Sequence, residues 1–319
     1  MKKVIVFGGG AGLSCLLSGL KLFPLEVTTV IAVSDNGSST GVLKEEFDIP
    51  AVGDVGKVLL SMANIDDDFI DLLSYRFKKE NSSLYNHPVR NILMTALIDL
   101  KGNLTEATEY MSRILNIKGE VLPLTEERAE LVGHNEENGE EFFGEVVVSQ
   151  NIKNISTLSY DRDIHVGNRV KKGIADADLI IFSPGSLYTS ILPHLIVDDI
   201  VEEIGKAKAP IMYVSNLVTQ PGETDGYSVS EHVKVLNDHL GNRKVDVVVA
   251  NNGQIDRRVA RRYLETEGKT MVELDRSNVA VLGAQIIEDD IFCIEDERIR
   301  HKALDTAYHI FAYLMERKN

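Results

Sequence analysis

The sequence predicts an α/β protein with a Rossmann-like three-layer α/β/α fold and a mostly parallel sheet. Two patterns predict it: short apolar runs alternate with helical stretches from the first residues, and polar, glycine-containing loops follow several of those runs. Continuous apolar runs are typical of strands that are buried on both faces of a parallel sheet. A chain of 319 residues with 44% hydrophobic and 26% charged residues also has the composition of a globular protein with a large core.

Six apolar runs are the predicted strands. They lie at residues 4–7, 27–33, 178–183, 210–215, 245–250 and 279–287. The stretch 66–116 is predicted to be mostly helical, and a last helix is expected at about 301–317.

One stretch interrupts this alternation. Around 119–165, the segments ELVGH and FFGEVVVS lie on either side of Asn138-Gly139, a pair that is typical of tight hairpin turns. This predicts a small antiparallel β excursion in the α/β core. Because no Pro-rich or Ser-rich linker flanks it, we expect residues 1–319 to form a single nucleotide-binding domain.

Charge and cysteine content exclude several classes of protein. With 34 Lys and Arg against 49 Asp and Glu, the net charge is −15, which argues against binding to nucleic acid or to an anionic membrane surface. No apolar run approaches the ~20 residues of a membrane span, so no membrane insertion is expected. Cys15 and Cys293 are too few for a disulfide framework or a four-ligand zinc site, which fits a reduced, cytoplasmic setting.

The first candidate binding loop follows the first predicted strand. Gly8, Gly9, Gly10 and Gly12 lie between this strand and a helix, where backbone N–H groups and the helix dipole hold phosphate. Leu13 stands where the last glycine of a G-x-G-x-x-G fingerprint would be, so the loop is not a strict dinucleotide motif. The alternative is a tight β–α turn that needs small residues.

Two acidic loops come next along the chain. Asp35 follows the second strand, where a ribose-binding carboxylate lies in nucleotide folds, and Asn36, Ser38 and Ser39 could hold phosphate or metal. The alternative is a flexible polar loop. Asp54 precedes another helical stretch, and it either caps that helix or binds a ligand.

Two further loops follow the predicted strands at 178–183 and 210–215. Their candidate ligand-binding residues are Gly185, Ser186, Tyr188, Thr189, Asn216, Thr219 and Gln220. Because the carboxyl ends of parallel strands lie at one edge of a sheet, we expect all these loops to converge on one crevice for a phosphate-bearing ligand. Ser186 lies in no G-x-S-x-G elbow, so a serine hydrolase is not predicted.

Several of these segments resemble one protein family. GGGAGLS, SDNGSSTG, GDVGKVL, SPGSLYTSILPHL and NLVTQPGETDGYSVSEHV together resemble the YvcK, or gluconeogenesis-factor, branch of the CofD-like proteins. The resemblance runs from Val4 to about residue 300. It implies a Rossmann-like fold, UDP-N-acetylglucosamine as the type of ligand, and a role in cell shape and cell-wall precursor supply on gluconeogenic carbon sources.

The resemblance also implies site residues. Gly9, Gly10, Gly12 and Leu13 match the nucleotide-facing turn of the family, and His87 and Asn91 match its G-H-x-x-G-N pattern, in which Arg90 replaces glycine. The basic cluster around Arg300 resembles a C-terminal motif of the family. We therefore expect Arg300 and Tyr263 to contact the nucleotide-sugar, although a salt bridge between Arg300 and the nearby acidic run is an alternative.

The sequence predicts metal binding less clearly than nucleotide binding. Asp35 and Asp54 match acids that are associated with magnesium in the related 2-phospho-L-lactate transferases, but Asn36 replaces a second acid. Since Mg²⁺ prefers carboxylate and phosphate oxygens, we expect only weak Mg²⁺ binding and little Mg²⁺ dependence.

The sequence is compatible with three functions. A nucleotide-sugar-binding regulator without turnover is favoured over a magnesium-dependent 2-phospho-L-lactate transferase, which remains the alternative. An NAD(P)-dependent oxidoreductase is the weakest, because the glycine fingerprint is broken. The sequence leaves the oligomeric state and any protein effector open.

Overall fold

The computed structural model describes residues 1–295 and 297–317. A seven-stranded sheet, parallel throughout, forms its centre, in the order β10-β9-β8-β7-β1-β2-β3. The strands are β1 (Lys2–Gly8), β2 (Leu25–Ile31), β3 (Glu120–Pro123), β7 (Leu179–Phe182), β8 (Ile211–Val214), β9 (Val247–Asn251) and β10 (Gln285–Asp289). The predicted α/β class and mostly parallel sheet are confirmed.

The strand order contains a switch point. From β1 the chain builds β2 and β3 on one side, then returns to the other side of β1 and builds β7, β8, β9 and β10. In open α/β sheets, ligands bind outside the carboxyl ends of the strands at such a point. Here it lies between β1 and β7.

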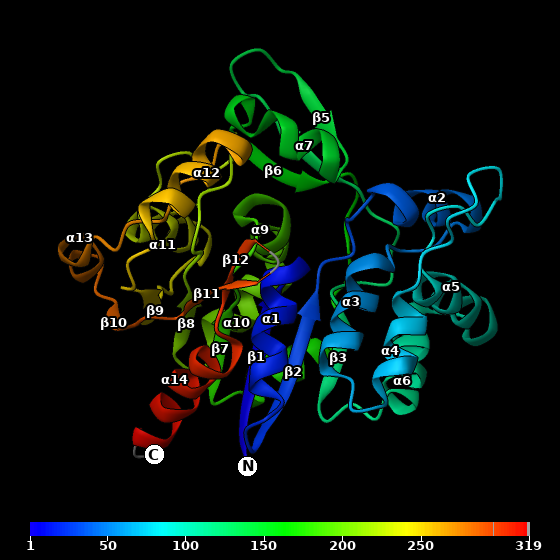
Figure 1. Ribbon diagram of the computed structural model, residues 1–319, viewed down its shortest axis with the longest axis horizontal. Coiled ribbons are helices and arrows are strands. Elements are labelled where there is room, and N and C mark those ends of the chain that lie inside the picture. Colours follow the sequence, from blue (N-terminus) through cyan, green and yellow to red (C-terminus); the bar gives the residue numbers. More distant parts are fainter. Residues whose placement is uncertain (296, 318–319) are drawn as a thin grey trace.

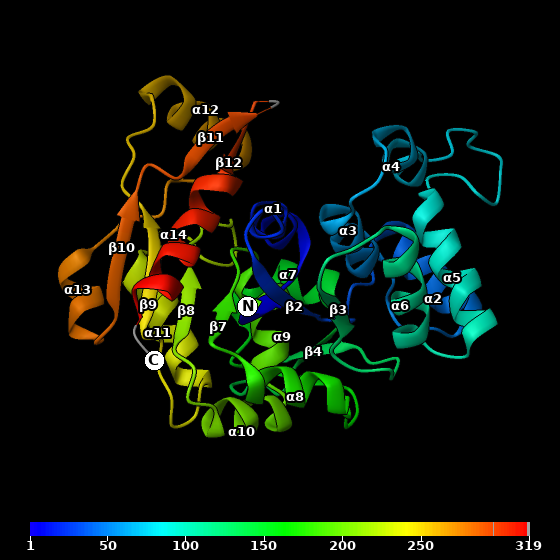
Figure 2. The same ribbon diagram turned by 90° about the horizontal axis from the view of Figure 1, so that it is seen from below.

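Helices cover both faces of the sheet. Figure 2 shows α1 (Gly10–Leu20) and α14 (Ala303–Glu316) on one side, with α8 (Asn168–Asp176) and α10 (Asp198–Lys206) on the other. The remaining helices are α2 (Ser38–Phe47), α3 (Gly53–Met62), α4 (Asp67–Ser74), α5 (Val89–Lys101), α6 (Leu104–Ile114), α7 (Glu145–Asn151), α9 (Leu192–Leu195), α11 (Val229–His239), α12 (Arg257–Glu267) and α13 (Arg276–Val281). The helical prediction for 66–116 is confirmed by α4, α5 and α6, and the last predicted helix by α14.

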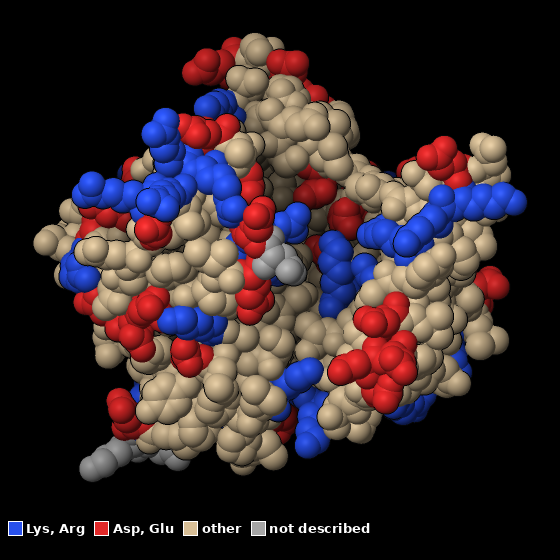
Figure 3. All heavy atoms as spheres, in the orientation of Figure 1, with Lys and Arg blue, Asp and Glu red and all other residues tan. Residues whose placement is uncertain are grey.

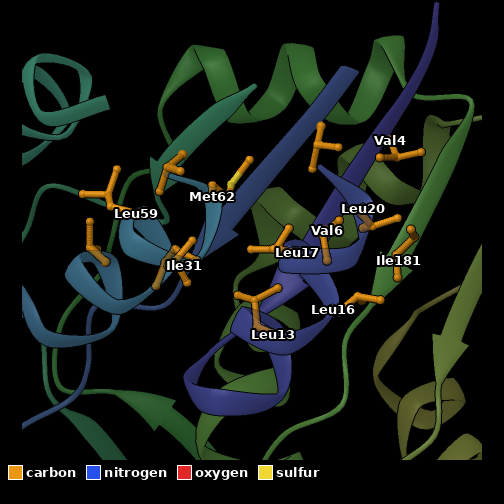
Figure 4. Packing of buried hydrophobic residues seen from close by; sticks show 14 of the residues in the cluster. Val4, Val6, Leu13, Leu16, Leu17, Leu20, Ile31, Leu59, Met62 and Ile181 are labelled. Carbon is orange, nitrogen blue, oxygen red and sulfur yellow. The ribbon is translucent and has the colours of Figure 1, made fainter. Parts of the chain in front are cut away.

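The apolar runs are buried on both faces for a simple geometric reason. Side chains alternate across a strand, so Val4 and Val6 of β1 enter one core cluster while Ile5 and Phe7 enter the other. In the first cluster, Leu13, Leu16, Leu17 and Leu20 of α1 pack over the sheet, together with Leu59 and Met62 of α3 (Figure 4). The first turns of α1 and α3 are thereby fixed beside the end of β1.

Two small antiparallel sheets stand outside the main one. β4 (Leu131–His134) pairs with β5 (Glu141–Phe143) and β6 (Thr157–Tyr160), and β11 (Phe292–Glu295) pairs with β12 (Arg298–His301). Figure 1 shows β5, β6 and α7 above the ends of β1 and β2. The hairpin turns as predicted near Gly139, which has a φ of +73°.

Three predictions of element type or boundary are wrong. Residues 120–123 pair in parallel with β2, so the antiparallel excursion begins at β4, and FFGEVVVS leaves the hairpin at Gly144 to form α7. The run at 279–287 is split, because Val279 is buried as part of α13 and Gly283, with a φ of +88°, turns the chain into β10. Apolar residues alone do not distinguish a buried helical turn from a strand. Within the described residues, no helix combines the length and apolarity that crossing a bilayer requires.

Candidate functional site

A cavity of about 270 Å³ lies at the switch point of the sheet. It is lined by Gly9, Gly10, Ala32, Ser34, Asp35, Asp54, Lys57, Glu145, Ser149, Ser186, Thr189, Ser190 and Gln220. These residues follow β1, β2, β7 and β8 or belong to the first two turns of α3 and α7. Figure 3 shows the hollow at the centre of this face, with acidic side chains in it and basic side chains beside it.

The glycine turn forms one wall. Gly9 is extended and precedes α1, and Gly10 has a φ of +65°, which disfavours any side chain. A Cβ atom on Gly10 would meet no atom within 4 Å, and Gly10 lines the cavity. The Gly10 N–H donates to Oδ2 of Asp54 at 3.2 Å. An anion therefore already lies at the N-terminus of α1, and Asp54 caps α1 rather than its own helix.

The turn after β7 forms the adjoining wall. It leads into the single-turn π-helix η2 (Leu187–Ile191), whose preceding Ser186 accepts the N–H of Thr189 at 3.1 Å. Ser186 Oγ donates to Oε1 of Glu223 at 2.8 Å, and the Tyr188 N–H donates to the same oxygen at 2.9 Å. Asn216 holds Gly185 from both sides, accepting its N–H at 2.9 Å and donating to its carbonyl at 2.8 Å. Asn216 and Glu223 therefore fix this wall in place.

Three carboxylates face the cavity. Burial and then the charge of Asp54 raise the pKa of Asp35, while the Gly37 N–H opposes this rise. Burial, followed by the nearby Asp35, raises the pKa of Glu145 to about 7, against a hydrogen bond from Thr189. Lys57 pairs with Asp54 at 2.7 Å and is the one cation among the described residues that line the cavity. The cavity thus holds negative charge that the protein itself does not balance.

The acids fit a metal ion only in part. Asp35 and Asp54 share the cavity as expected, but no three Asp, Glu, His or Cys side chains in the described part of the chain are grouped to hold a metal ion. Both Asp54 oxygens already accept hydrogen bonds, from Gly10 and Lys57. An ion such as Mg²⁺ would therefore need most of its oxygen ligands from a bound phosphate or from water.

The structure does not bring every predicted residue into the cavity. Asn36 donates to Glu130 and accepts from the Val146 N–H, so it holds α7 near β4. Ser39 forms a buried network with His87 and Asn91. Ser38, at a φ of +39°, begins α2 and does not line the cavity.

Four more predicted residues have packing or anchoring positions. Leu13 is fully buried in the first core cluster, and a Cβ on Gly12 would lie 2.2 Å from the Pro184 carbonyl, so Gly12 permits close approach of α1 to the turn after β7. Thr219 bonds Thr270 through backbone and side chain. Tyr188 does not line the cavity, although its N–H anchors the wall; its hydroxyl lies 3.4 Å from that of Tyr227.

The two C-terminal candidates lie outside the cavity. Tyr263 of α12 is buried, and its hydroxyl accepts the N–H of Ile299. Arg300 is half-buried on β12, opposite Cys293. Of the acidic run 295–297 in the predicted alternative, residue 296 lies outside the described residues, and among the described residues no ion pair joins Arg300 to Glu295 or Glu297, so the alternative stays a prediction.

Sequence reasoning missed two chemically important residues. Glu145 reaches the cavity because α7 folds back from the antiparallel excursion, and nothing local in the sequence indicates this position. Lys57 could have been found, because it lies three residues after Asp54 on one helical face. Ser34, Ser149 and Ser190 add hydroxyl groups.

Comparison with known proteins agrees with this fold. The family profile described as 2-phospho-L-lactate transferase CofD matches residues 4–292. A Thermotoga maritima relative is 40% identical over 309 residues, covering 96% of this chain and 97% of its own. A Bacillus subtilis relative named gluconeogenesis factor is 38% identical over 303 residues, or 94% of each chain.

A solved structure also matches this chain over nearly its full length. The crystal structure of a Bacillus halodurans protein superposes with a TM-score of 0.92 at 35% identity, covering 97% of this chain and 99% of that one. Sequence and fold thus agree over almost the whole length. The chain belongs to the CofD family, together with relatives that carry the name gluconeogenesis factor.

Proposed function

We propose that this protein binds a nucleotide-sugar of the UDP-N-acetylglucosamine class in the cavity at the switch point, and that it acts as a regulator without turnover. In this proposal, occupancy of the cavity reports the supply of cell-wall precursor and thereby influences cell shape during growth on gluconeogenic carbon sources. The name carried by the relatives supports the metabolic setting, and the site chemistry supports the ligand class.

One observation carries the proposal. The carboxylate of Asp54 already accepts the Gly10 N–H at the start of α1, as a phosphate oxygen would. The turn at Ser186–Thr189 lies beside the glycine turn on the wall of the same cavity. A diphosphate between these walls would meet the positive ends of α1 and η2, and it would displace Asp54 from Gly10.

The carboxylates suit the other part of the ligand. A carboxyl group accepts hydrogen bonds in either protonation state, and sugar hydroxyls are matching donors. We therefore place the hexose towards Asp35 and Glu145 and the diphosphate towards the glycine turn. A volume of about 270 Å³ is near the lower end of ligand pockets, so the uridine must extend out along the crevice.

A second candidate function is the family's transferase chemistry. The shared cavity of Asp35 and Asp54 favours it, because magnesium-dependent transfer needs carboxylates near the phosphates. Against it stand the absence of a grouped set of three metal ligands among the described residues and the use of Asn36 as a structural link. In the alternative, Mg²⁺ would be held by the two acids and the ligand's phosphates and would offset charge on the transferred group.

The test has two arms. The first arm measures the melting temperature of the purified protein, with and without Mg²⁺, in the presence of UDP-N-acetylglucosamine, other UDP-sugars, GDP or NAD. We expect the UDP-sugars to raise it most, because a ligand that binds only the folded state raises the apparent stability of the protein. In the second, the protein receives Mg²⁺, a guanylyl-phospholactate donor and a deazaflavin acceptor, with Asp54→Ala as the control. Turnover that disappears in the control would replace the regulator by the transferase.

A further inference from the structure

The fold brings the two cysteines of the chain to one point. Cys15 lies on α1 and Cys293 on β11, far apart in sequence. Cys15 Sγ donates to the His301 carbonyl oxygen at 3.3 Å, and Cys293 Sγ lies 3.8 Å from the same oxygen. The two sulfurs therefore cannot be farther apart than these two distances together.

The shared oxygen is held in place. The His301 ring is buried and lies 3.0 Å from the Ser215 carbonyl, and His301 pairs with Phe292 across the β11–β12 hairpin. Burial lowers the pKa of His301 to about 4, so its ring is neutral and donates to Ser215. The hairpin is thus docked beside α1 with both thiols facing the same carbonyl.

We propose that Cys15 and Cys293 are a modification site: they form a reversible intramolecular disulfide that links α1 to the β11–β12 hairpin, with a low-molecular-weight disulfide as the oxidant. One cysteine thiolate attacks a sulfur of the oxidant and releases one small thiol. The second cysteine then attacks the mixed disulfide and releases the other small thiol. The two cysteine sulfurs lose two electrons to the oxidant, and their two protons end on the released thiols.

The contact of both sulfurs with one carbonyl oxygen and the access of both thiols favour this step. A disulfide needs the sulfurs at about 2.05 Å, so each side chain must turn from the carbonyl towards the other sulfur. Both cysteines are half-buried, which leaves a path for a small oxidant. Burial raises the pKa of both thiols, the nearby Glu295 adds to this, and Arg300 opposes it for both. The exchange is therefore slow at neutral pH and faster in alkaline buffer.

The crosslink would connect the cavity wall to the hairpin that carries Arg300, whose contact with the ligand is a separate prediction. α1 begins at Gly10 on the cavity wall, and β12 carries Arg300 directly opposite Cys293. Any effect of oxidation on ligand affinity rests on the proposed function, whereas the formation of the disulfide does not.

The test uses glutathione disulfide in alkaline buffer, followed by alkylation of remaining thiols, intact-mass measurement and peptide mapping. We expect the wild type to lose two hydrogen atoms and to yield one crosslinked peptide pair containing Cys15 and Cys293, which a dithiol reverses. Cys15→Ser and Cys293→Ser are matched controls that should each carry one glutathione and no crosslink. Oxidised wild type should also melt at a higher temperature than reduced wild type, because the crosslink restricts the unfolded chain.

Three results would overturn the proposal: wild type that carries two glutathiones, wild type that stays unreacted under excess oxidant, or disulfides found only between separate chains. Because the crosslink is measured by mass, the disulfide proposal can be tested even if no UDP-sugar binds. Conversely, loss of the proposed ligand function leaves this result unchanged.

Discussion

Two hollows of nearly equal volume lie at opposite ends of the strands of the main sheet, and they differ in charge balance. We call these two ends of the sheet the carboxyl edge and the amino edge. One, at the carboxyl ends of the strands, has about 270 Å³; the other, at the amino ends, has about 280 Å³ and is lined by Lys3, Glu26, Glu120, Arg169 and Asp176 among others. At the amino edge the charges neutralise one another, since Lys3 pairs with Asp176 at 3.3 Å and Arg169 pairs with Glu120.

The carboxyl edge is different. Asp35, Asp54 and Glu145 face one lysine, and the pKa of Asp35 and of Glu145 is raised. Groups with perturbed pKa values in a cleft are typical of functional sites, whereas closed ion pairs are typical of structural surfaces. Volume alone does not separate the two hollows, but the unbalanced charge and the two helix N-termini at the carboxyl edge do.

The largest expected effect comes from filling the carboxyl-edge cavity. In Gly10→Val the side chain would enter the space proposed for the diphosphate, so affinity for UDP-N-acetylglucosamine should fall about a hundredfold or more, ~2.7 kcal/mol. Titration calorimetry measures this. Gly139→Val is the matched control, because Gly139 also has a positive φ and open space around it but lies in the remote hairpin turn. Equal affinities of the two variants would contradict the site.

The next effect tests how far the ligand extends beyond the cavity. Arg300→Ala should weaken binding about tenfold, ~1.4 kcal/mol, if its guanidinium reaches the diphosphate or uridine along the crevice. Arg298→Ala is the control, because Arg298 is exposed on the same strand. If Arg300→Ala lowers only the melting temperature, Arg300 is a packing residue and the ligand ends within the cavity.

A smaller change in affinity is expected when one lysine from each hollow is replaced in turn. Lys57→Met removes the cation beside the carboxyl-edge acids and should reduce affinity about fivefold, ~1 kcal/mol, a modest loss because Lys57 is half exposed. Lys172→Met changes an exposed lysine of the amino-edge hollow and should leave affinity unchanged. The reverse result would move the site to the amino edge.

The smallest effect depends on pH. Glu145 has a pKa of about 7, so its carboxyl is neutral below that pH and repels phosphate above it. Affinity of the wild type should fall by about threefold as pH rises through this range, ~0.6 kcal/mol, and Glu145→Gln should abolish the change. Glu136→Gln, an exposed change in the same excursion, should behave as wild type.

Glu145 also has a stability signature with a defined sign. Because folding raises its pKa above the ordinary value, Glu145 stabilises the protein at low pH, and this contribution is lost as pH rises through about 7. Glu145→Gln should therefore melt higher than wild type in alkaline buffer and close to it in acid. A constant difference across the pH range would show that Glu145 does not titrate as described.

The sequence could predict the parts of the site that topology brings together. Glycine turns and acids that follow parallel strands must meet at one edge, which is why Gly10, Asp35, Asp54 and Ser186 were found. Glu145 could not be found, because α7 reaches the cavity through the packing of a separate antiparallel sheet. Packing also explains why Leu13, inside a motif, belongs to the core.

The central claim is that the diphosphate of a UDP-sugar lies between the N-termini of α1 and η2. A crystal structure of the complex with UDP-N-acetylglucosamine tests it most directly. We expect diphosphate oxygens at hydrogen-bond distance, about 2.7–3.2 Å, from the Gly10 N–H and from the turn at Ser186–Thr189, with Asp54 released from Gly10. A ligand in the amino-edge hollow beside Lys3 and Arg169, or one whose diphosphate contacts neither turn, would contradict the account.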